Sequence, residues 1–370
     1  MERTEFFRRR RDVALLVGLA FLLALVLGIA IHAQATSRLI REAKDDLLLL
    51  ETARSSALQN FLETVHSEAV LWGDHGPVRD GLEVLSAAWQ ELDPDAGERL
   101  RRLYVNENPH PEAERHLYNQ APDRSAYTLY HTTVQPAVRR FLQVNEYHDI
   151  LLCGSDGDVL YSFYKEEDFA TNLVSGPWRD TDLGIVFRQA RDAAKGEVVF
   201  SDFERYEPSA NAPTAFVAGP VFKGDGSLLG VLIFQISVER INEIMQFTEG
   251  MGETGETYLV GTDHLMRSDS RFSDESVILV QSVESETVRR ALAGESGVEI
   301  TEGYRGEEVI SAYGLLEFAG IRWAVIAEID LEDVLRPARR LRRNLFLAGI
   351  VILLLVAVAA TVNPPPLTRN

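Results

Sequence analysis

The sequence predicts an α+β fold in which one domain occurs twice in tandem on a long N-terminal helix. Three observations carry this prediction. The 370-residue chain has an uncharged apolar segment near each end, a long segment without glycine or proline after the first of them, and a repeated order of short strands and helices between residues 146 and 335. Strands joined by short hairpins, with helices kept apart from them, are typical of antiparallel α+β domains.

The two apolar segments are predicted transmembrane helices. Residues 13–33 and 344–362 contain no Asp, Glu, Lys or Arg, and about 20 apolar residues in a helix cross the ~30 Å hydrocarbon layer of a bilayer. The first segment could instead be a cleaved signal peptide, because Ala33-Gln34-Ala35 has the small-x-small pattern of a cleavage site. Its apolar run is longer than the usual ~7–15 residues of such a peptide, so we favour an uncleaved anchor.

Positive charge before the first segment predicts the orientation of the chain. Consecutive arginines, Arg8 to Arg11, favour the cytoplasmic side, so residues 1–12 are expected inside. Two crossings of the inner membrane then place residues 34–343 in the periplasm. A second group of arginines argues against this orientation because it lies just outside the second crossing: Arg336, Arg339, Arg340, Arg342 and Arg343. The charge rule acts mainly on short loops, and a loop of about 300 residues translocates largely regardless of charge.

A long helix is predicted directly after the first crossing. Residues 34–72 contain neither glycine nor proline, and their apolar side chains recur at helical spacings. At 1.5 Å per residue such a helix is about 58 Å long. It needs a surface to pack on, which its own domain, a second copy of the chain or both would supply, so a homodimer is expected. Residues 78–145 look mostly helical, with prolines in the loops.

Two similar hairpin sequences reveal an internal repeat. LCGSDGDVLYS at 152–162 and LVGTDHLMRS at 259–268 each predict a strand, a turn and a second strand. The closing strands at 231–241 and 324–334 also match without a gap. Each copy reads strand, strand, helix, strand, strand, strand. We therefore predict two five-stranded antiparallel sheets with helices on one face of each.

The charge and the cysteine count exclude some classes of protein. The formal net charge is −19, which argues against nucleic-acid binding because that needs a basic surface. Cys153 is the single cysteine, so no intramolecular disulfide can form. No HExxH, CxxC or GxSxG motif occurs, and we expect neither a catalytic residue nor a metal or cofactor site in the extracytoplasmic part.

Four segments resemble the double Cache extracytoplasmic sensor domain of bacterial receptors: YHDILLCGSDGDVLYSFYKEEDFATNL, GEVVFSDFERY, GPVFKGDGSLLGVLIFQIS and GETGETYLVGTDHLMRSDSR. The resemblance covers nearly all of residues 34–343. It implies two PAS-like (Cache) modules, of which the one far from the membrane usually binds a small ligand, often an amino acid, amine or carboxylate. The second membrane helix of such receptors passes the signal to a cytoplasmic output.

The repeat, the apolar segments and the resemblance together predict how the chain is divided. The predicted parts are a cytoplasmic N-terminus at 1–12, a transmembrane helix at 13–33, a long helix and helical region at 34–145, a membrane-distal module at 146–241, a membrane-proximal module at 242–335, a juxtamembrane segment at 336–343, a second transmembrane helix at 344–362 and a truncated cytoplasmic tail at 363–370.

The resemblance places a ligand pocket beside the segment TNLVSGPWRDTD, between the second and third strands of the distal module. Trp178 offers an apolar wall and a ring donor, and Arg179 offers a fork that matches a carboxylate. Asp180 and Asp182 could accept hydrogen bonds from an ammonium group. Trp178 could equally belong to the core, and Arg179 could pair with either aspartate at the surface.

Four further residues complete the predicted site. Tyr161 and Phe163 lie on the same face of their strand, Tyr206 on a later loop and Gln235 on the last strand of the module. Amino-acid sensors of the family have an Asp at the position that resembles Gln235, and a Trp-Tyr pair after a spaced Arg, whereas here the Trp precedes the Arg. These differences make an α-amino acid a less expected ligand and leave carboxylates, amines and other small molecules open.

These features predict the small-molecule sensor region of a bacterial transmembrane receptor of the chemoreceptor type. After the second crossing the chain has only NPPPLTRN, in which Pro366-Leu367 resembles the start of a HAMP helix, so the output domain is absent from the sequence. The sensor region of a histidine kinase, or of a nucleotide or diguanylate cyclase, is the alternative. A membrane-anchored extracytoplasmic enzyme or scaffold is the second alternative, although no nucleophile, base and acid converge in the sequence.

Overall fold

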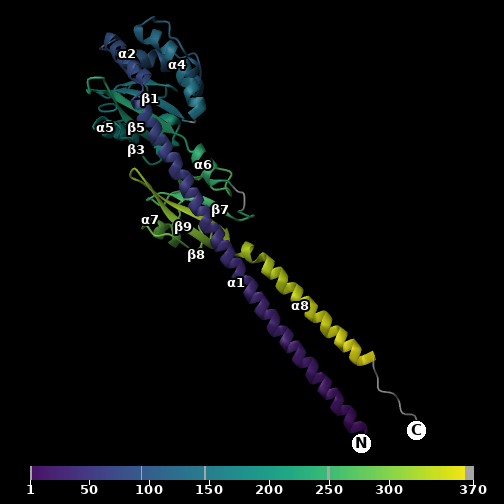
Figure 1. Cartoon of the computed structure of the whole chain (residues 1–370). Coiled ribbons are helices and arrows are strands. Elements are labelled where there is room, and N and C mark those ends of the chain that lie inside the picture. The colour runs from purple at the N-terminus through teal and green to yellow at the C-terminus, as the bar shows by residue number, and fades with distance from the viewer. Residues whose placement is uncertain (1, 93, 146, 248–250, 363–370) are drawn as a thin grey trace.

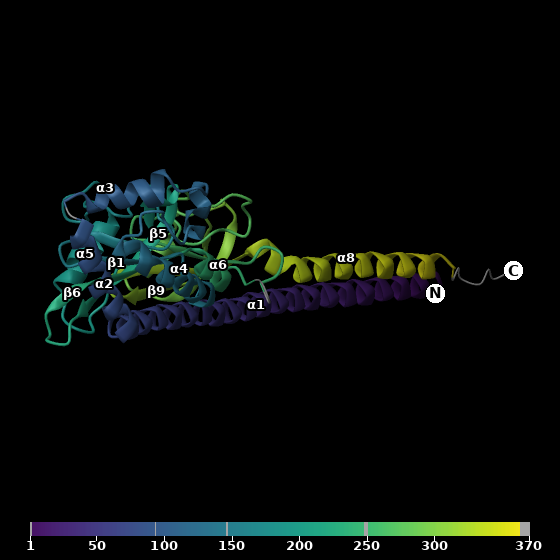
Figure 2. The same cartoon turned by 90° about the horizontal axis from the view of Figure 1, so that it is seen from above.

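The computed structural model describes residues 2–92, 94–145, 147–247 and 251–362. Its longest element is α1 (Glu2–Gly73), one uninterrupted helix of 72 residues that joins the first apolar segment to the predicted long helix. Both sheets lie along its C-terminal half, and its N-terminal half runs away from them beside α8 (Leu331–Val362) (Figure 1; Figure 2). The predicted tail at 363–370 lies outside the described residues.

The parts of α1 and α8 that extend beyond the sheets expose large apolar side chains. On α1, Leu23 is 62% and Ile29 is 61% exposed, and on α8, Leu354 is 61% and Leu355 is 64% exposed. Apolar surface of this kind is typical of a helix surrounded by lipid. Among the described residues, one helix, α1, has a stretch near its N-terminus that is long and apolar enough to cross a membrane. The second crossing, in α8, stays a prediction.

The end of the molecule opposite the two termini is helical, in agreement with the prediction for residues 78–145. Short helices surround the C-terminal end of α1 and one side of the first sheet (Figure 1). Their buried side chains, such as Leu82, Tyr104 and Tyr127, form one core with that sheet. These helices are α2 (Gly76–Leu92), α3 (Ala96–Arg101), η1 (Arg102–Asn106), η2 (Glu112–Leu117) and α4 (Ala126–Asn145).

The first sheet follows these helices. Its strands run antiparallel in the order β2-β1-β6-β5-β3, and β4 pairs separately with β5, so the sheet has six strands where five were expected. Its elements in chain order are β1 (Asp149–Gly154), β2 (Val159–Ser162), α5 (Asp182–Arg191), β3 (Val199–Phe200), β4 (Glu204–Tyr206), η3 (Glu207–Ser209), β5 (Ala212–Phe222), β6 (Leu228–Ile236) and α6 (Glu239–Met245).

The second sheet repeats this pattern with one strand fewer than expected. Its order is β7-β10-β9-β8, and α7 packs against β9 and β10. Residues 264–268 were predicted as a strand, but they make only isolated bridges, in which Met266 pairs with Val260 and Leu265 pairs with Ser282. The elements are β7 (Glu256–Val260), α7 (Glu286–Leu292), β8 (Gly297–Glu302), β9 (Glu308–Phe318) and β10 (Ile321–Asp330).

Helices cover both faces of each sheet, which corrects the expectation of helices on one face. In β1, Ile150 and Leu152 belong to the core shared with α1, α2 and α4, whereas Leu151 and Cys153 belong to the core shared with α5. Side chains alternate along a strand, so a strand that is apolar at every position must be covered on both sides. Every residue of β1 is buried, as this requires.

Gly230 of β6 lies opposite Gly154 of β1 at a point where the two backbones leave no room for a side chain. A Cβ at Gly230 would collide with the carbonyl oxygen of Cys153 and lie 3.3 Å from a methyl group of Leu82. We expect Gly230→Ala to lower the free energy of unfolding by about 2–3 kcal/mol, because backbone atoms must move to accept the methyl group. Urea denaturation of the full-length protein in detergent measures this loss.

The matched control is Gly224→Ala, since Gly224 lies in an exposed turn and a Cβ there meets no atom within 4 Å. It should change the free energy of unfolding by less than about 0.5 kcal/mol. Equal effects of the two substitutions would contradict the register of β1 and β6.

Candidate ligand-binding site

A hollow of ≈ 450 Å³ opens at the end of the first sheet, between the C-terminal end of β6, the loop after β2 and the short helix η3. Its volume falls within the usual range of about 300–1,000 Å³ for small-molecule sites. Carboxylate, amide, hydroxyl and imidazole groups line it, and its polar lining residues are Glu112, His148, Tyr164, Glu166, Ser209, Thr214, Gln235, Ser237 and Glu239.

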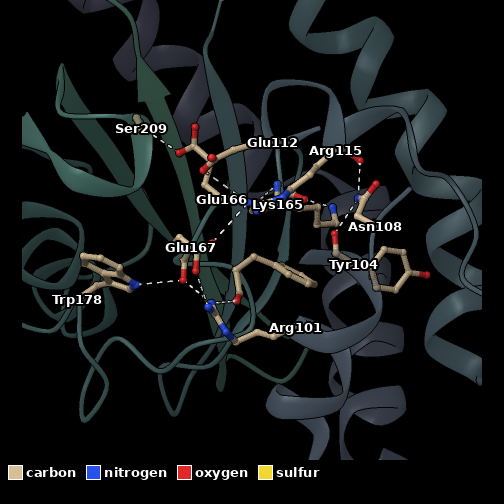
Figure 3. Close-up of polar contacts among 12 residues, drawn as sticks. Arg101, Tyr104, Asn108, Glu112, Arg115, Lys165, Glu166, Glu167, Trp178 and Ser209 are labelled. Carbon is tan, nitrogen blue, oxygen red and sulfur yellow. Dashed lines mark hydrogen bonds and ion pairs between the residues drawn. The ribbon is translucent and has the colours of Figure 1, made fainter. Parts of the chain in front are cut away.

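The loop that follows β2, residues 163–170, forms one wall of this site and is held from outside by arginines. Arg101 binds Glu167 with an Nη2–Oε2 distance of 2.6 Å and also donates to the carbonyl of Phe169. Arg115 approaches the other carboxylate oxygen of Glu167 at 3.5 Å. Trp178 Nε1 donates to the Glu167 carbonyl at 3.2 Å. Figure 3 shows these contacts converging on Glu167, which anchors the loop.

The residues on either side of Glu167 bind groups on the sheet side of the loop. Glu166 Oε2 accepts a hydrogen bond of 2.6 Å from Ser209 Oγ, and Ser209 Oγ accepts one of 2.9 Å from Gln235 Nε2 (Figure 3 shows Ser209 and Glu166). Asp168 Oδ2 accepts a hydrogen bond of 2.8 Å from the hydroxyl of Tyr206. The loop is therefore linked to β4, η3 and β6 by neutral donors.

Two buried oxygens of this site have no hydrogen-bond partner among the described residues. They are Asp168 Oδ1 and Gln235 Oε1, on side chains that are each 2% exposed. Buried polar atoms in folded proteins are nearly always paired, and each unpaired one is costly. Gln235 lines the hollow, and its amide oxygen is an acceptor that needs a donor from elsewhere, whereas Asp168 lies outside the lining.

The site also holds more negative than positive charge. Burial raises the pKa of Asp168 to about 8, with a further contribution from the charges of Glu166 and Asp149. Burial likewise raises the pKa of Asp149 to about 6. Burial opposes protonation of His148, but the carboxylate of Glu166, 3.6 Å from its Nε2, outweighs that effect and raises its pKa. A group that brings N–H donors and positive charge would relieve both deficits.

Lys165, in the same loop, faces away from this site. Its side chain is fully buried, and its Nζ donates to Gln135 Oε1 at 3.2 Å and lies 4.2 Å from the ring centre of Tyr161. Burial lowers its pKa to about 7. Its side chain is therefore directed to the core under α4, where the charge of Asp149 partly opposes the effect of burial on its pKa.

The structure brings three of the predicted site residues together. Tyr206 and Gln235 contribute polar groups as described above, and the ring of Trp178 packs edge-on against Tyr206 with 6.3 Å between ring centres. Trp178 packs against the core under α5, which was the alternative interpretation, and its role in binding stays a prediction.

The other predicted residues lie apart from the hollow. Arg179 is exposed and pairs with the exposed Asp180 at 3.2 Å, which was the alternative interpretation. Asp182 lies in the first turn of α5, and burial raises its pKa to about 6. Tyr161 and Phe163 are buried on the α4 side, where Tyr161 donates to Gln135. Their roles in binding stay predictions.

Sequence reasoning missed the acidic residues of the site. The run Glu166-Glu167-Asp168 follows the second strand directly, and such a run is usually a solvated surface. The signal that could have revealed these residues is the position of the run, which comes shortly after a buried strand and has the aromatic residues Tyr164 and Phe169 on its two sides. Asp149 at the start of β1 was missed in the same way, because its opposite residue Gln235 is known only from the strand register.

Two stacked α+β modules on a membrane-directed helix, with a solute-sized polar hollow in the outer one, define an extracytoplasmic sensor region. The chain belongs to the Cache domain family, which matches residues 32–338. The resemblance inferred from the sequence is thereby confirmed.

A curated relative is the "Probable chemoreceptor y4sI" of Sinorhizobium fredii, which is 28% identical over 193 residues, covering 51% of this chain and 23% of that protein. The chain thus spans about a quarter of the length of the curated relative it matches. Among solved structures, the sensory domain of the Campylobacter jejuni chemoreceptor Tlp1 is 12% identical with a TM-score of 0.45, over 81% of this chain and 99% of that one. The ligand-binding domain of the Pseudomonas aeruginosa chemoreceptor PctC, in complex with GABA, is 14% identical with a TM-score of 0.42, over 78% and 100%.

The raised pKa of Asp168 predicts how stability depends on pH. Because the folded state favours the protonated carboxyl, its stabilising contribution is present below the unfolded pKa of about 4 and is lost as pH rises through about 8. The unfolding temperature of the ligand-free full-length protein should therefore fall between about pH 4 and pH 8 and level off above that. Asp168→Asn, which stays neutral, should reduce that fall, as differential scanning calorimetry in detergent will measure.

The control for this experiment is Asp180→Asn, because the side chain of Asp180 is 80% exposed. Its pH profile should match that of the unchanged protein. A profile of Asp168→Asn that also matches would show that Asp168 is not protonated in the folded state.

Proposed function

We propose that this chain is the periplasmic small-molecule sensor region of a bacterial transmembrane receptor of the chemoreceptor type, and that the hollow of its distal module binds a small protonated amine. Membership of the Cache family and the curated chemoreceptor relative support the first part. The observation that carries the second part is Gln235 Oε1, a buried and unpaired acceptor in the lining of the hollow, which also contains the carboxylate of Glu166. The alternative is that the chain is the sensor region of a histidine kinase or of a cyclase.

An amine fits the charges of the hollow better than a carboxylate does. A carboxylate ligand would lie among Glu112, Glu166 and Glu239, while the arginine expected to bind it, Arg179, is paired outside. An ammonium group supplies up to three N–H donors for the unpaired oxygens. The ring of Tyr164 in the lining adds an aromatic face, which attracts cations.

A ligand in this position would connect two parts of the module that lead toward the membrane. It would join the 163–170 loop to Gln235, near the C-terminal end of β6, and α6 begins three residues after the last residue of that strand. Asn242 of α6 donates to Asp269 of the proximal module at 2.7 Å. The ligand changes the state of the receptor to the extent that it favours one arrangement of these contacts over another.

Binding can be tested by isothermal titration of the full-length protein in detergent with alkylamines, diamines and short carboxylates. For an amine that binds, Glu166→Gln should weaken affinity at least about tenfold, equivalent to about 1.4 kcal/mol, because it removes a carboxylate from the lining that would pair with the ammonium group. Arg179→Ala is the control and should leave amine affinity unchanged. Binding of carboxylates alone, lost in Arg179→Ala, would instead support the carboxylate site expected from the sequence.

We also propose that α8 is a second membrane crossing, which places residues 34–343 in the periplasm. The support is the apolar surface of α8 from Leu345 to Leu355, which lies beside the apolar part of α1 (Figure 1). Alkaline phosphatase fused after residue 343 should be active in cells, and the same enzyme fused after residue 365 should be inactive. Activity of both fusions would refute the second crossing.

Dimerisation through α1 is a further part of the proposal. An exposed stripe on α1 repeats every eleven residues at Leu49, Asn60 and Leu71, and the two leucines are 70% and 63% exposed. Sedimentation of the full-length protein in detergent should reveal a dimer that Leu71→Glu weakens. Val144→Glu, on an equally exposed residue of α4, is the control and should leave the dimer intact. A protein that sediments as a monomer at every concentration would contradict this proposal.

A further inference from the structure

Two glutamates of the proximal module face each other inside the protein. Glu256 of β7 pairs with Glu328 of β10 in the antiparallel register, so their side chains lie on one face of the sheet. The Cβ atoms of such directly opposed residues are about 5 Å apart. Each residue is only 1% exposed.

The donors around these glutamates are hydroxyl groups. Glu256 accepts hydrogen bonds from Ser270 and, at 2.8 Å, from Tyr304, while Glu328 Oε2 accepts one of 3.0 Å from Tyr258. Glu328 Oε1 is buried and has no partner among the described residues. Gly303 lies in front of this oxygen, and a Cβ there would come within 3.4 Å of it.

In the described part of the chain no basic side chain forms a hydrogen bond or ion pair with either glutamate, although the charge of Arg305 partly opposes the effect of burial on the pKa of both. The nearest candidate, Arg305, donates to Asp330 at 2.9 Å and stacks 4.2 Å from the ring centre of Phe272. Arg271 donates instead to the carbonyl of Gly255. Two buried carboxyl groups without a cation are costly to keep, since neither can ionise without a large desolvation penalty.

The same strand positions are polar in both copies of the repeat. In the distal sheet Asp149 lies opposite Gln235, and in the proximal sheet Glu256 lies opposite Glu328. The distal pair borders the hollow described above. The proximal module therefore carries an acidic pair at the position where its sister module has a ligand site.

We propose that the Glu256–Glu328 pair is a second ligand site, which binds ammonium or a small alkylammonium ion. The cation would donate to the free Oε1 of Glu328 and to Glu256, and the rings of Tyr258 and Tyr304, 5.3 Å apart at their centres, would flank it. Tyr304 is partly buried in the turn after β8 and separates the pair from solvent. This inference does not depend on the ligand of the distal hollow.

The surroundings favour a nitrogen cation over a metal ion. Among the described residues no group of three or more His, Cys, Asp or Glu side chains is placed to hold a metal. Aromatic walls stabilise organic ammonium ions through their electron-rich faces. In the empty site burial, with the charge of Glu256, raises the pKa of Glu328 to about 8, so a bound cation takes the place of a proton.

The test uses the full-length Glu166→Gln protein in detergent, in which binding to the distal hollow is already weakened. Titration with methylammonium chloride should still reveal one binding event per chain, and its affinity should rise between about pH 6 and pH 8.5 as Glu328 loses its proton. Adding Glu328→Gln, which keeps the shape of the side chain, should lower the affinity at least about tenfold. Sodium chloride at equal ionic strength is the salt control.

Three results would overturn the proposal: unchanged affinity in Glu328→Gln, binding of magnesium or calcium but not of methylammonium, or a pH-dependent stability with no heat of amine binding. If Glu328→Gln does not fold, Tyr304→Phe replaces it, because that change removes a flanking hydroxyl and keeps both carboxylates. It should weaken binding about threefold to tenfold, and unchanged affinity would again overturn the proposal. Loss of distal binding alone would leave this second site unaffected.

Discussion

The arrangement of the whole molecule depends on the packing of one continuous helix against both sheets. Leu58, Leu62 and Val65 of α1 belong to the core of the first sheet, and Leu47 belongs to that of the second. A helix is stiff over this length, so the two modules cannot change their positions along it without exposing apolar surface. The same helix carries the apolar segment toward the membrane, and a movement of either module must therefore act on α1 (Figure 1).

A second contact joins the modules directly. Arg267 of the proximal module is 4% exposed and binds both carboxylate oxygens of Asp202, each at 3.1 Å. Trp323 donates to the same carboxylate at 2.8 Å and stacks near Phe203. Arg267 belongs to residues 264–268, which make only isolated bridges in the second copy of the repeat. The corresponding segment of the first copy forms strand β2. The loss of that strand therefore coincides with the contact between the modules.

Both modules contain buried carboxyl groups that form no ion pair with a basic side chain among the described residues. Such groups lower the free energy of unfolding. Asp168 in one module and Glu328 in the other would be replaced by apolar residues if packing alone mattered, since a buried acid contributes little unless it is paired. Such groups can instead convert the binding of a cation into a change of conformation, because the empty and filled states differ in charge at the ends of β6 and β10. Each strand leads directly into a helix, β6 into α6 and β10 into α8.

The features that the sequence determined by itself are those set by local periodicity and repetition. The uninterrupted helix follows from the absence of glycine and proline in residues 34–72, and the tandem modules follow from hairpins that match over short, contiguous segments. Turn and strand preferences act over a few residues, so a single sequence is sufficient to read them.

Only the tertiary structure decided which side chains meet in the site. The sequence favoured Arg179, which lies at the surface, and overlooked Asp168, which is buried beside Tyr206. Contacts of this kind join residues that are tens of positions apart, and they depend on strand register and on the path of a loop. The pairing of Glu256 with Glu328 has the same origin, because a shift of one residue in that register would have turned one of the two carboxylates to the opposite face of the sheet.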